Sequence, residues 1–447
     1  MQANSKTAIG TTRRMSARRL RVERRGEDVG AAASSASRRI TRADSASPAT
    51  FARVSPVYSP PTRAKLRKPL ARALALGHPW VFRDALDEID AAPGAVVTVL
   101  DERGRFVARG IADDGPIGVR IFVTRDEPVD ERLFAARVRD AATLRSRVVP
   151  PDTDAYRLVH GEGDRLPGFV CDVYGSYATV QLDGGGAEAW REVFLDALAP
   201  ALEERGVGTV LVRTGKRGAR TVEVARGPAP PPLVSVRERG MVLVVDLVSG
   251  QKTGLFLDHR ESRAEVRGLA RGLRVLNLYG YTGGFSVAAG LGGASAVTTV
   301  DIAPRAIELA EQTWQSNSLS APHRGVVSDV PAFLADAVAR GERWDLIVCD
   351  PPSFAPSERA LATALDSYRS LHRACLKVLA PGGLYVAASC SSHVDRDDFD
   401  ATLRDQGLRP GAVLQVLMRS GGAADHPRLA AFPEGDYLKV VVARVVG

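Results

Sequence analysis

Residues 275–285 read VLNLYGYTGGF, an apolar run that ends in a glycine-containing turn ahead of a helix-like segment. Glycines in such a turn let the backbone bend tightly and approach a ligand closely. The pattern differs from G-x-G-x-x-G, because tyrosines stand where a dinucleotide-binding enzyme would have glycine. We interpret this stretch as a buried strand followed by a ligand-binding loop.

Apolar runs of strand length alternate with helix-length segments from about residue 240 onward. The predicted strands are residues 242–248, 275–278, 297–301, 325–329, 346–350 and 384–388. This rhythm is typical of a parallel sheet with helices on both faces. Ligands of such sheets bind at the carboxyl ends of the strands, so the residues at these ends are the candidate site.

Acidic residues stand at two of these strand ends. Asp301 could accept hydrogen bonds from both ribose hydroxyls of a nucleoside-bearing cofactor. It could also cap the helix that begins near Pro304, and the two roles are compatible. Asp329 could reach an adenine edge, or it could be only a polar turn residue.

The last two predicted strands end in an acid and a thiol. Asp350 begins the sequence DPPSF, whose prolines make a rigid frame that suits recognition of an amidine-like base edge; a merely structural loop is the alternative. Cys390 ends the next strand and should face the same cleft. It could be a nucleophile or a small buried hydrophobe. Cys349 and Cys375 are expected in the core.

The region before residue 240 divides into three parts. Residues 1–62 are rich in Arg, Ser, Ala and Thr, which predicts a disordered basic tail. Residues 64–131 contain short strands separated by glycine turns, as in a small β-barrel, with Arg105, Arg109 and Arg120 expected to point outward. Residues 132–240 predict a central α+β domain, and residues 241–447 form the α/β domain described above.

Composition narrows the class of protein. The 447-residue chain has a net charge of +8 and a pI of about 9.5, which favours a polyanionic partner such as RNA. No apolar run approaches the ~18 residues of a membrane span. The four cysteines are scattered without zinc-type spacing, and no secretory signal is visible, so we expect a cytoplasmic protein without a metal site.

Ordered motifs across residues 64–447 resemble the bacterial 23S rRNA cytosine-C5 methyltransferases that carry an N-terminal PUA domain. These motifs are GHPWVF (77–82), GEGDRLPG (161–168), GQKTGLFLDHR (250–260), the loop 277–285, DPPSF (350–354), SCS (389–391), DHP (425–427), PE (433–434) and YLK (437–439). The resemblance implies a Rossmann-like class I methyltransferase domain, a PUA-like barrel that binds RNA, and S-adenosylmethionine (SAM) as methyl donor.

The resemblance also implies roles for individual residues. Those expected to contact SAM are Lys252, Thr253, Gly254, Phe256, Asn277, Tyr281, Gly283, Asp301 (ribose), Asp329 (adenine) and Asp350. Cys390 would attack carbon 6 of a cytosine, and Asp350 would hydrogen-bond the exocyclic amine and protonate N3. The base that removes the carbon 5 proton is unassigned. Many other RNA cytosine-C5 methyltransferases have a second cysteine where this chain has Ser353.

Two other functions remain open at this stage. The chain could be a SAM-dependent N-methyltransferase acting on guanine or adenine of RNA, since those enzymes also use an acid followed by prolines and an aromatic residue. It could also be a non-catalytic RNA-binding assembly factor. The sequence leaves open the target nucleotide and whether the protein is a monomer or a homodimer.

Overall fold

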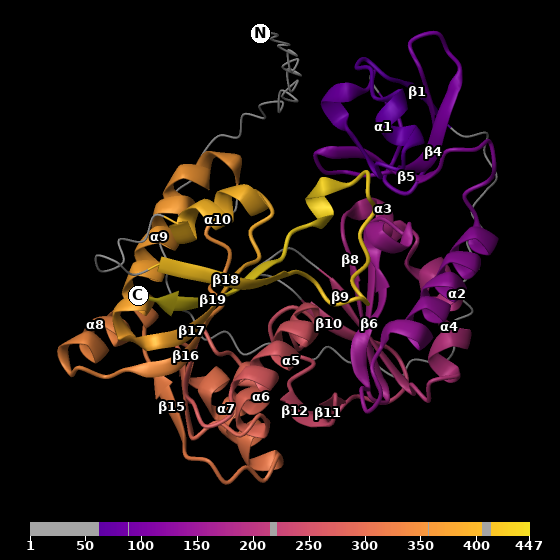
Figure 1. Cartoon of the computed structure of the whole chain (residues 1–447). Helices are drawn as coiled ribbons and strands as arrows, with labels where there is room; N and C mark the ends of the chain where they lie inside the picture. Colours follow the sequence, from indigo (N-terminus) through magenta and orange to yellow (C-terminus); the bar gives the residue numbers. More distant parts are fainter. Residues whose placement is uncertain (1–61, 88, 215–220, 356, 405–412) are drawn as a thin grey trace, which may run out of the picture. The chain divides into compact units, whose positions relative to one another are not determined.

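The computed structural model describes residues 62–447 apart from 88, 215–220, 356 and 405–412. Almost all of the expected basic tail (residues 1–61) therefore lies outside the described residues. Within the described part, the strands form three five- to seven-stranded sheets and one two-stranded sheet (Figure 1). No helix there is both long and apolar enough to cross a bilayer.

The first sheet has the order β1-β3-β4-β5-β2. Its elements are β1 (Thr62–Lys65), α1 (Ala71–Ala75), β2 (Trp80–Phe82), η1 (Arg83–Ala85), β3 (Val96–Leu100), β4 (Phe106–Ala112) and β5 (Ile117–Val123). Alternate strand residues such as Val97, Val99 and Val119 are buried, as expected for a small closed core.

The outward position expected for Arg120 is wrong. Its side chain is 5% exposed, and its guanidinium contacts carboxylates of Asp113 (2.6 Å), Glu162 (3.2 Å) and Asp183 (2.8 Å). An arginine can be buried when several carboxylates neutralise it, and these come from segments that the strand pattern does not reveal.

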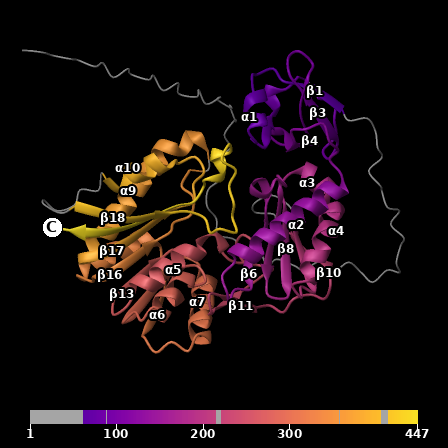
Figure 2. The ribbon, with the colours of Figure 1, turned by 45° about the vertical axis from the view of Figure 1, so that its right-hand side comes forward.

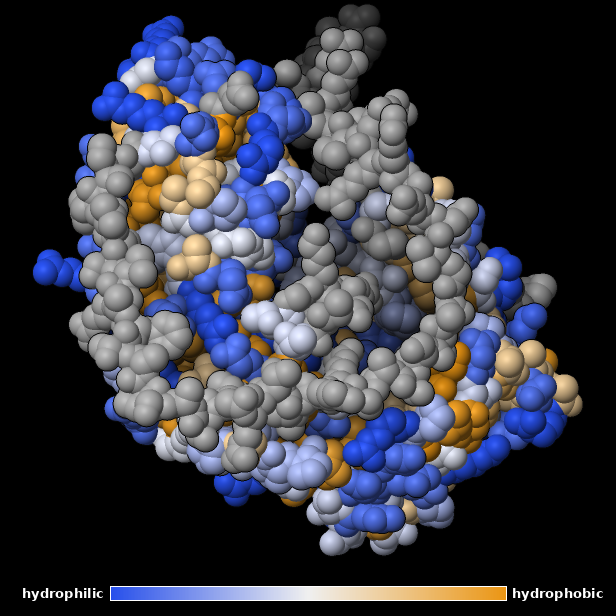
Figure 3. All heavy atoms as spheres, turned by 180° about the vertical axis from the view of Figure 1, so that it is seen from behind, coloured by the Kyte–Doolittle hydropathy of each residue, from blue (hydrophilic) through white to orange (hydrophobic). Residues whose placement is uncertain are grey.

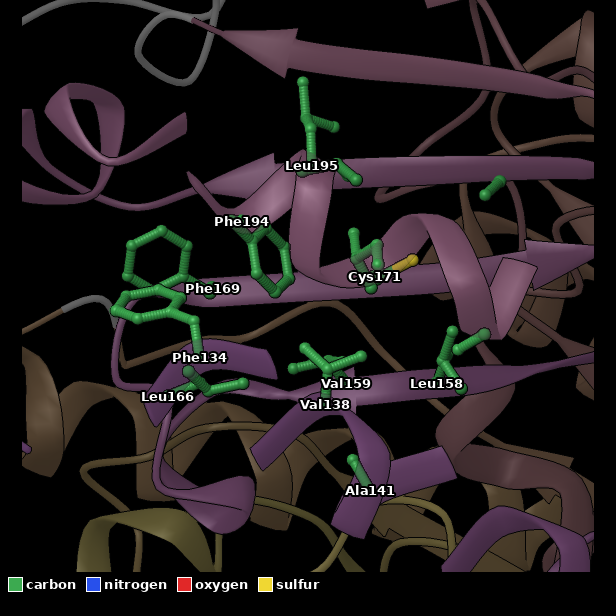
Figure 4. Packing of buried hydrophobic residues seen from close by; sticks show 14 of the residues in the cluster. Phe134, Val138, Ala141, Leu158, Val159, Leu166, Phe169, Cys171, Phe194 and Leu195 are labelled. Atoms are coloured by element: carbon green, nitrogen blue, oxygen red, sulfur yellow. The ribbon is translucent and has the colours of Figure 1, made fainter. Parts of the chain in front are cut away.

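The second sheet, in the order β10-β9-β8-β7-β6, forms the central region. Its elements are α2 (Glu131–Val148), β6 (Ala155–His160), η2 (Gly161–Asp164), β7 (Phe169–Tyr174), β8 (Tyr177–Leu182), α3 (Gly185–Ala189), α4 (Arg191–Glu203), β9 (Thr209–Thr214) and β10 (Thr221–Arg226). Phe134 of α2, Phe169 of β7 and Phe194 of α4 meet in its core (Figure 4). Helices α2 and α4 therefore pack on the same sheet.

Residues 242–248 do not belong to the large parallel sheet as predicted. Strand β12 (Met241–Val245) pairs only with β11 (Val234–Glu238), in an antiparallel hairpin. Arg239 and Gly240 between them both have positive φ (48° and 78°), the conformation that closes a tight hairpin. A short apolar run looks alike in either kind of sheet.

The third large sheet has the order β15-β14-β13-β16-β17-β19-β18, and β19 alone runs antiparallel to the other six strands. The strands are β13 (Arg274–Leu278), β14 (Ala296–Asp301), β15 (His323–Val327), β16 (Trp344–Cys349), β17 (Leu379–Ser389), β18 (Val413–Ser420) and β19 (Lys439–Val446). The expected βαβ architecture is confirmed, with an antiparallel C-terminal strand that the sequence reading missed.

Helices cover both faces of this sheet (Figures 1 and 2). One face packs against α5 (Arg260–Leu269), α6 (Gly284–Leu291) and α7 (Pro304–Ser316), and the other against α8 (Val330–Ala339), α9 (Leu361–Val378) and α10 (Arg396–Arg404). Short turns of helix lie at η3 (Leu257–His259), η4 (Glu358–Ala360) and η5 (Pro433–Gly435). From β13, the next strands along the chain, β14 and β15, are added on one side of the sheet, whereas β16 and β17 are added on the other side of β13. The carboxyl ends of β13 and β16, which lie at this switch point, are therefore the expected ligand site.

The surface of the described residues carries both hydrophilic and apolar side chains. Figure 3 shows a mostly hydrophilic face on which apolar residues form small patches. The most exposed large apolar residues are Leu76, Ile302 and Val413. Leu76 and Ile302 are isolated, whereas Val413 shares the edge strand β18 with three other exposed apolar residues, Val416, Leu417 and Met418.

Candidate active site

The loop after β13 has an unusual backbone held by one carboxylate. Tyr279, Tyr281 and Gly283 all have positive φ (57°, 45° and 78°). The backbone N–H of Tyr281 donates to Asp301 Oδ2 (2.9 Å), while Asp301 Oδ1 accepts from the N–H of Ala303 (2.9 Å). Asp301 thus ties the two strand ends together, and each of its oxygens retains a second lone pair.

Asn277 leaves one polar atom without a protein partner. Its side chain is 1% exposed, and its Nδ2 donates to Ser286 Oγ (2.9 Å). Its Oδ1 is buried and accepts no hydrogen bond from the described residues. Buried polar atoms are normally satisfied, so this acceptor beside the glycine turn fits a ligand that carries a donor, such as the ammonium group of SAM.

Residues 252–256 lie against the same loop. The hydroxyl of Tyr281 donates to the carbonyl of Gly254 (3.1 Å) and accepts from the N–H of Gln251 (2.8 Å). The ring of Phe256 meets that of Tyr281 edge-on at 5.4 Å, and Lys252 Nζ lies 4.3 Å from the Phe256 ring centre. The expected wall residues therefore lie beside the loop of the first strand.

The side chains of Thr253 and Asp329 form hydrogen bonds within the protein. Thr253 is 2% exposed and its hydroxyl bonds to Asp172 Oδ2 (2.5 Å) and to the hydroxyl of Tyr174 (2.8 Å), which anchors the 252–256 loop to β7. Asp329 is exposed and caps α8 by accepting from the N–H of Ala332 (3.2 Å). Strand β15 ends two residues before it, at Val327.

Asp350 follows β16 directly, and its carboxylate has a buried neighbour. His259 Nε2 lies 3.1 Å from Asp350 Oδ2, and the Asp350 side chain is 18% exposed. The two prolines that follow restrict the backbone beyond Asp350. Phe354, which a purine methyltransferase could use for stacking, instead packs on Tyr368 with ring centres 4.9 Å apart.

Cys390 follows β17 and is the partly exposed member of the four cysteines, whereas Cys349 and Cys375 are buried in the core as expected. Burial raises the pKa of the Cys390 thiol to about 11, and the negative charge of Asp350 adds to the rise, while Lys252 opposes it. Asp350 and Cys390 follow the adjacent parallel strands β16 and β17, in which Cys349 lies opposite Ala387. The structure therefore places the acid and the thiol at the same edge of the sheet.

Two side chains, Tyr368 and Lys439, form hydrogen bonds with the turn that carries Cys390. Tyr368 of α9 bonds through its hydroxyl to Ser389 Oγ (2.9 Å) and Ser391 Oγ (3.1 Å). Lys439 Nζ donates to the carbonyl of Ser391 (2.6 Å), and burial lowers the pKa of this lysine to about 8. The thiol is thus placed by a fixed backbone.

Sequence reasoning gave no role to Tyr368, Lys439 or His259. Lys439 and His259 fall within motifs 437–439 and 250–260, but nothing in those strings shows what they contact. Ser353, at the place of the second cysteine in other enzymes, lies 3.0 Å from Ser391 through the two hydroxyl oxygens. It is therefore a further contact to the Cys390 turn.

Comparison with known proteins agrees with this arrangement. Residues 199–417 match the family of S-adenosylmethionine-dependent methyltransferases, and residues 64–124 match the PUA-like domain. The fold and the strand-end site thus define a SAM-dependent methyltransferase with an N-terminal PUA-like domain.

Curated relatives identify the family within this class. The chain is 35% identical over 393 residues to a ribosomal RNA large subunit methyltransferase I of Yersinia pestis (strain Angola), a match that covers 86% of this chain and 99% of that protein. The Salmonella arizonae protein of the same name matches at 35% over 86% and 98% of the two chains. The protein belongs to the ribosomal RNA large subunit methyltransferase I family.

Solved structures share the fold. A Streptococcus mutans protein classed as a SAM-dependent methyltransferase has a TM-score of 0.77 at 24% identity, covering 86% of this chain and all of its own. A second structure, a methyltransferase-class protein complexed with S-adenosylhomocysteine (SAH), has a TM-score of 0.75 at 24% identity, covering 86% of this chain and 99% of its own. The expected fold class, enzyme class and SAM dependence are confirmed.

Proposed function

We propose that the protein transfers a methyl group from SAM to carbon 5 of a cytosine in large-subunit ribosomal RNA, through a covalent adduct with Cys390. The observation that carries this proposal is the position of Cys390, a partly exposed thiol on a braced strand end beside Asp350. An N-methyltransferase has no use for a thiol at this place. The names of the relatives support ribosomal RNA as the substrate.

The chemistry requires both side chains, because carbon 5 of cytosine is a weak nucleophile. The Cys390 thiol gives up its proton to a base, and the thiolate Sγ forms a bond to carbon 6 while Asp350 places a proton on N3, so the ring becomes an enamine. Carbon 5 then takes the methyl group. Loss of the carbon 5 proton to a base and breakage of the S–C6 bond release 5-methylcytosine and restore the thiolate.

The cofactor is proposed to lie over β13 and β14. Asn277 Oδ1 would accept from the methionine ammonium group, Asp301 would accept from the ribose hydroxyls through its remaining lone pairs, and Asp329 would lie at the adenine edge. Lys252, Gly254 and Phe256 would wall the other side. Thr253 would act only through its backbone and its hold on β7.

The PUA-like barrel is proposed to hold the RNA backbone. The Arg105 side chain is 71% exposed, whereas that of Arg109 is only 15% exposed, and each already contacts a carboxylate, of Asp101 and Asp126 respectively. We take residues 64–131, 132–240 and 241–447 as the three domains.

Product analysis tests the proposal. Large-subunit rRNA transcripts are incubated with the protein and methyl-labelled SAM, digested to nucleosides and separated. The expected product is 5-methylcytidine, formed by the wild type and absent with Cys390→Ala. Methylated guanosine or adenosine, with full activity of Cys390→Ala, would overturn the cytosine-C5 assignment in favour of an N-methyltransferase. RNA binding without SAM affinity would indicate a non-catalytic factor.

A further inference from the structure

His259 is a buried histidine at the reaction centre that has no role in the chemistry described so far. It ends the η3 turn, its residue is 2% exposed, and its ring meets the edge of Phe285 of α6 at 5.4 Å between ring centres. Its Nε2 is 3.1 Å from Asp350 Oδ2, which is within ion-pair distance. Asp350 has no other ion pair within the described residues.

The other charges that face His259 are largely matched with one another. On its own loop, Asp258 contacts Lys252 Nζ at 2.8 Å. From α5, Arg263 forms two 2.6 Å hydrogen bonds with Glu238 of β11. Three other titratable groups are nearby: Cys390, Tyr437 and His426. The hydroxyl of Tyr437 donates to Asp258, and Nδ1 of His426, in the loop before β19, pairs with Asp425. Asp350 is thus the charge left for His259 to balance.

The ionised carboxylate of Asp350 carries no proton, although the reaction requires Asp350 to donate one to cytosine N3. A carboxylate at neutral pH only accepts hydrogen bonds, whereas protonation of cytosine N3 requires a donor. The imidazolium–carboxylate pair and the imidazole–carboxylic acid pair hold the same protons, so a shift of one proton between Nε2 and Oδ2 turns Asp350 into a donor.

We infer that His259 supplies the proton that Asp350 gives to cytosine N3 and takes it back when the adduct collapses, an inference that rests on the proposed cytosine-C5 function. In the first step Cys390 Sγ bonds to carbon 6, the C5=C6 electron pair moves to C4–C5, and the C4=N3 pair takes a proton from Asp350. The proton on Nε2 of His259 passes to the Asp350 oxygen. After methyl transfer and loss of the carbon 5 proton, the N3 proton returns by the same route.

The second ring nitrogen of His259 fits this use. His259 Nδ1 is buried and has no hydrogen-bond partner among the described residues. No second acceptor therefore fixes an imidazolium from behind, in contrast to His426, whose Nδ1 lies 2.9 Å from Asp425 Oδ1. Asp350 is the carboxylate in ion-pair contact with the ring, so the proton can leave once N3 of the substrate competes for it.

The test compares His259→Gln with the wild type and with His393→Gln. Glutamine can place an N–H at Asp350 but carries no ionisable proton, and His393 is a half-buried histidine three residues from Cys390 to which no role is given. Single-turnover 5-methylcytidine formation is measured from pH 5.5 to 9 with saturating RNA and SAM, and SAM affinity is measured by calorimetry. His259→Gln should bind SAM like the wild type and react about 100-fold more slowly, as expected for loss of a general acid.

Two further readouts separate proton supply from mere positioning. The pH profile of the single-turnover rate should differ between His259→Gln and the wild type, because only the wild type passes a proton through the pair, and His393→Gln should keep the wild-type profile. Asp350→Asn/His259→Gln should be no slower than Asp350→Asn alone, since His259 acts through Asp350. A His259→Gln rate within about threefold of wild type, or a double variant slower than either single variant, would overturn the inference. If the wild type forms no 5-methylcytidine, the proposed function itself fails.

Discussion

The two halves of the large sheet hold their site residues in different ways. On the β13–β14–β15 half, Asp301 is fixed by backbone N–H groups of the loops it joins, and Asp329 caps the helix that follows it. On the β16–β17 half, Asp350 and the Cys390 turn are held by side chains from distant segments, His259 and Lys439 among them. The two acids of the proposed cofactor half are therefore held by local backbone contacts, whereas the proposed reaction residues are held by tertiary packing.

The largest expected effect comes from removing the thiol of the reaction half. Cys390→Ala should lower single-turnover methyl transfer by on the order of 10³-fold or more, as for loss of a covalent nucleophile. SAM affinity by calorimetry should stay unchanged, because the cofactor half is untouched. Ser392→Ala, at the exposed neighbouring position, is the control that should keep its activity. An active Cys390→Ala enzyme would contradict the division between the halves.

Removing the acid function of Asp350 should have the next largest effect. Asp350→Asn keeps the shape but cannot give a proton to N3, so the rate should fall about 10²- to 10³-fold, as when one preorganised transition-state donor is lost. Asp345→Asn is the matched control at the opposite end of β16, where the carboxylate accepts from the N–H of Arg274 (2.8 Å). Equal losses in the two variants would indicate general damage to the strand.

The cofactor half should respond in affinity. Asp301→Ala removes two backbone hydrogen bonds and the proposed ribose acceptor, so SAM binding should weaken by about 1–3 kcal/mol, roughly 5- to 150-fold. The methyl-transfer rate at saturating SAM should change little. Asp329→Ala, which alters an exposed cap, should weaken SAM binding less. A larger loss for Asp329→Ala would reverse the assigned roles of the two acids.

The smallest expected effect is a change in the alkylation rate of Cys390, in the reaction half, when ligands of different charge occupy the cofactor half. Burial and the Asp350 charge raise the pKa of Cys390 to about 11, so below that pH alkylation of the thiol by iodoacetamide should quicken about tenfold per pH unit. A positively charged SAM analogue such as sinefungin should speed alkylation several-fold over neutral SAH, by favouring the nearby thiolate. Peptide mass spectrometry follows Cys390. No difference between the two ligands would place the donor away from the thiol.

Sequence patterns predicted the parts of the site that follow strands directly. Asp301, Asp350 and Cys390 each come at or just after an apolar run, and parallel strands bring such ends to one edge. The fold class could be predicted for the same reason. Strand β12 was misassigned because a run of five apolar residues, four of them buried, looks alike in a hairpin and in a parallel sheet.

The bracing residues could not be predicted, because their partners are distant in the sequence. His259 meets Asp350 and Lys439 meets Ser391 only after the chain has folded. Arg120 shows the same effect in the barrel, where carboxylates from three segments allow a buried charge that local alternation would expose. Charge partners set by tertiary structure leave no periodic signal in the sequence.

Trapping with 5-fluorocytidine RNA tests the central claim most directly. Fluorine at carbon 5 cannot leave as a proton does, so an enzyme that attacks carbon 6 remains bound to the RNA after methyl transfer. The account predicts a SAM-dependent, denaturation-resistant complex whose cross-linked peptide contains Cys390, and no such complex with Cys390→Ala. Methyl transfer to ordinary RNA without any trapped complex, or a cross-link at another residue, would contradict it.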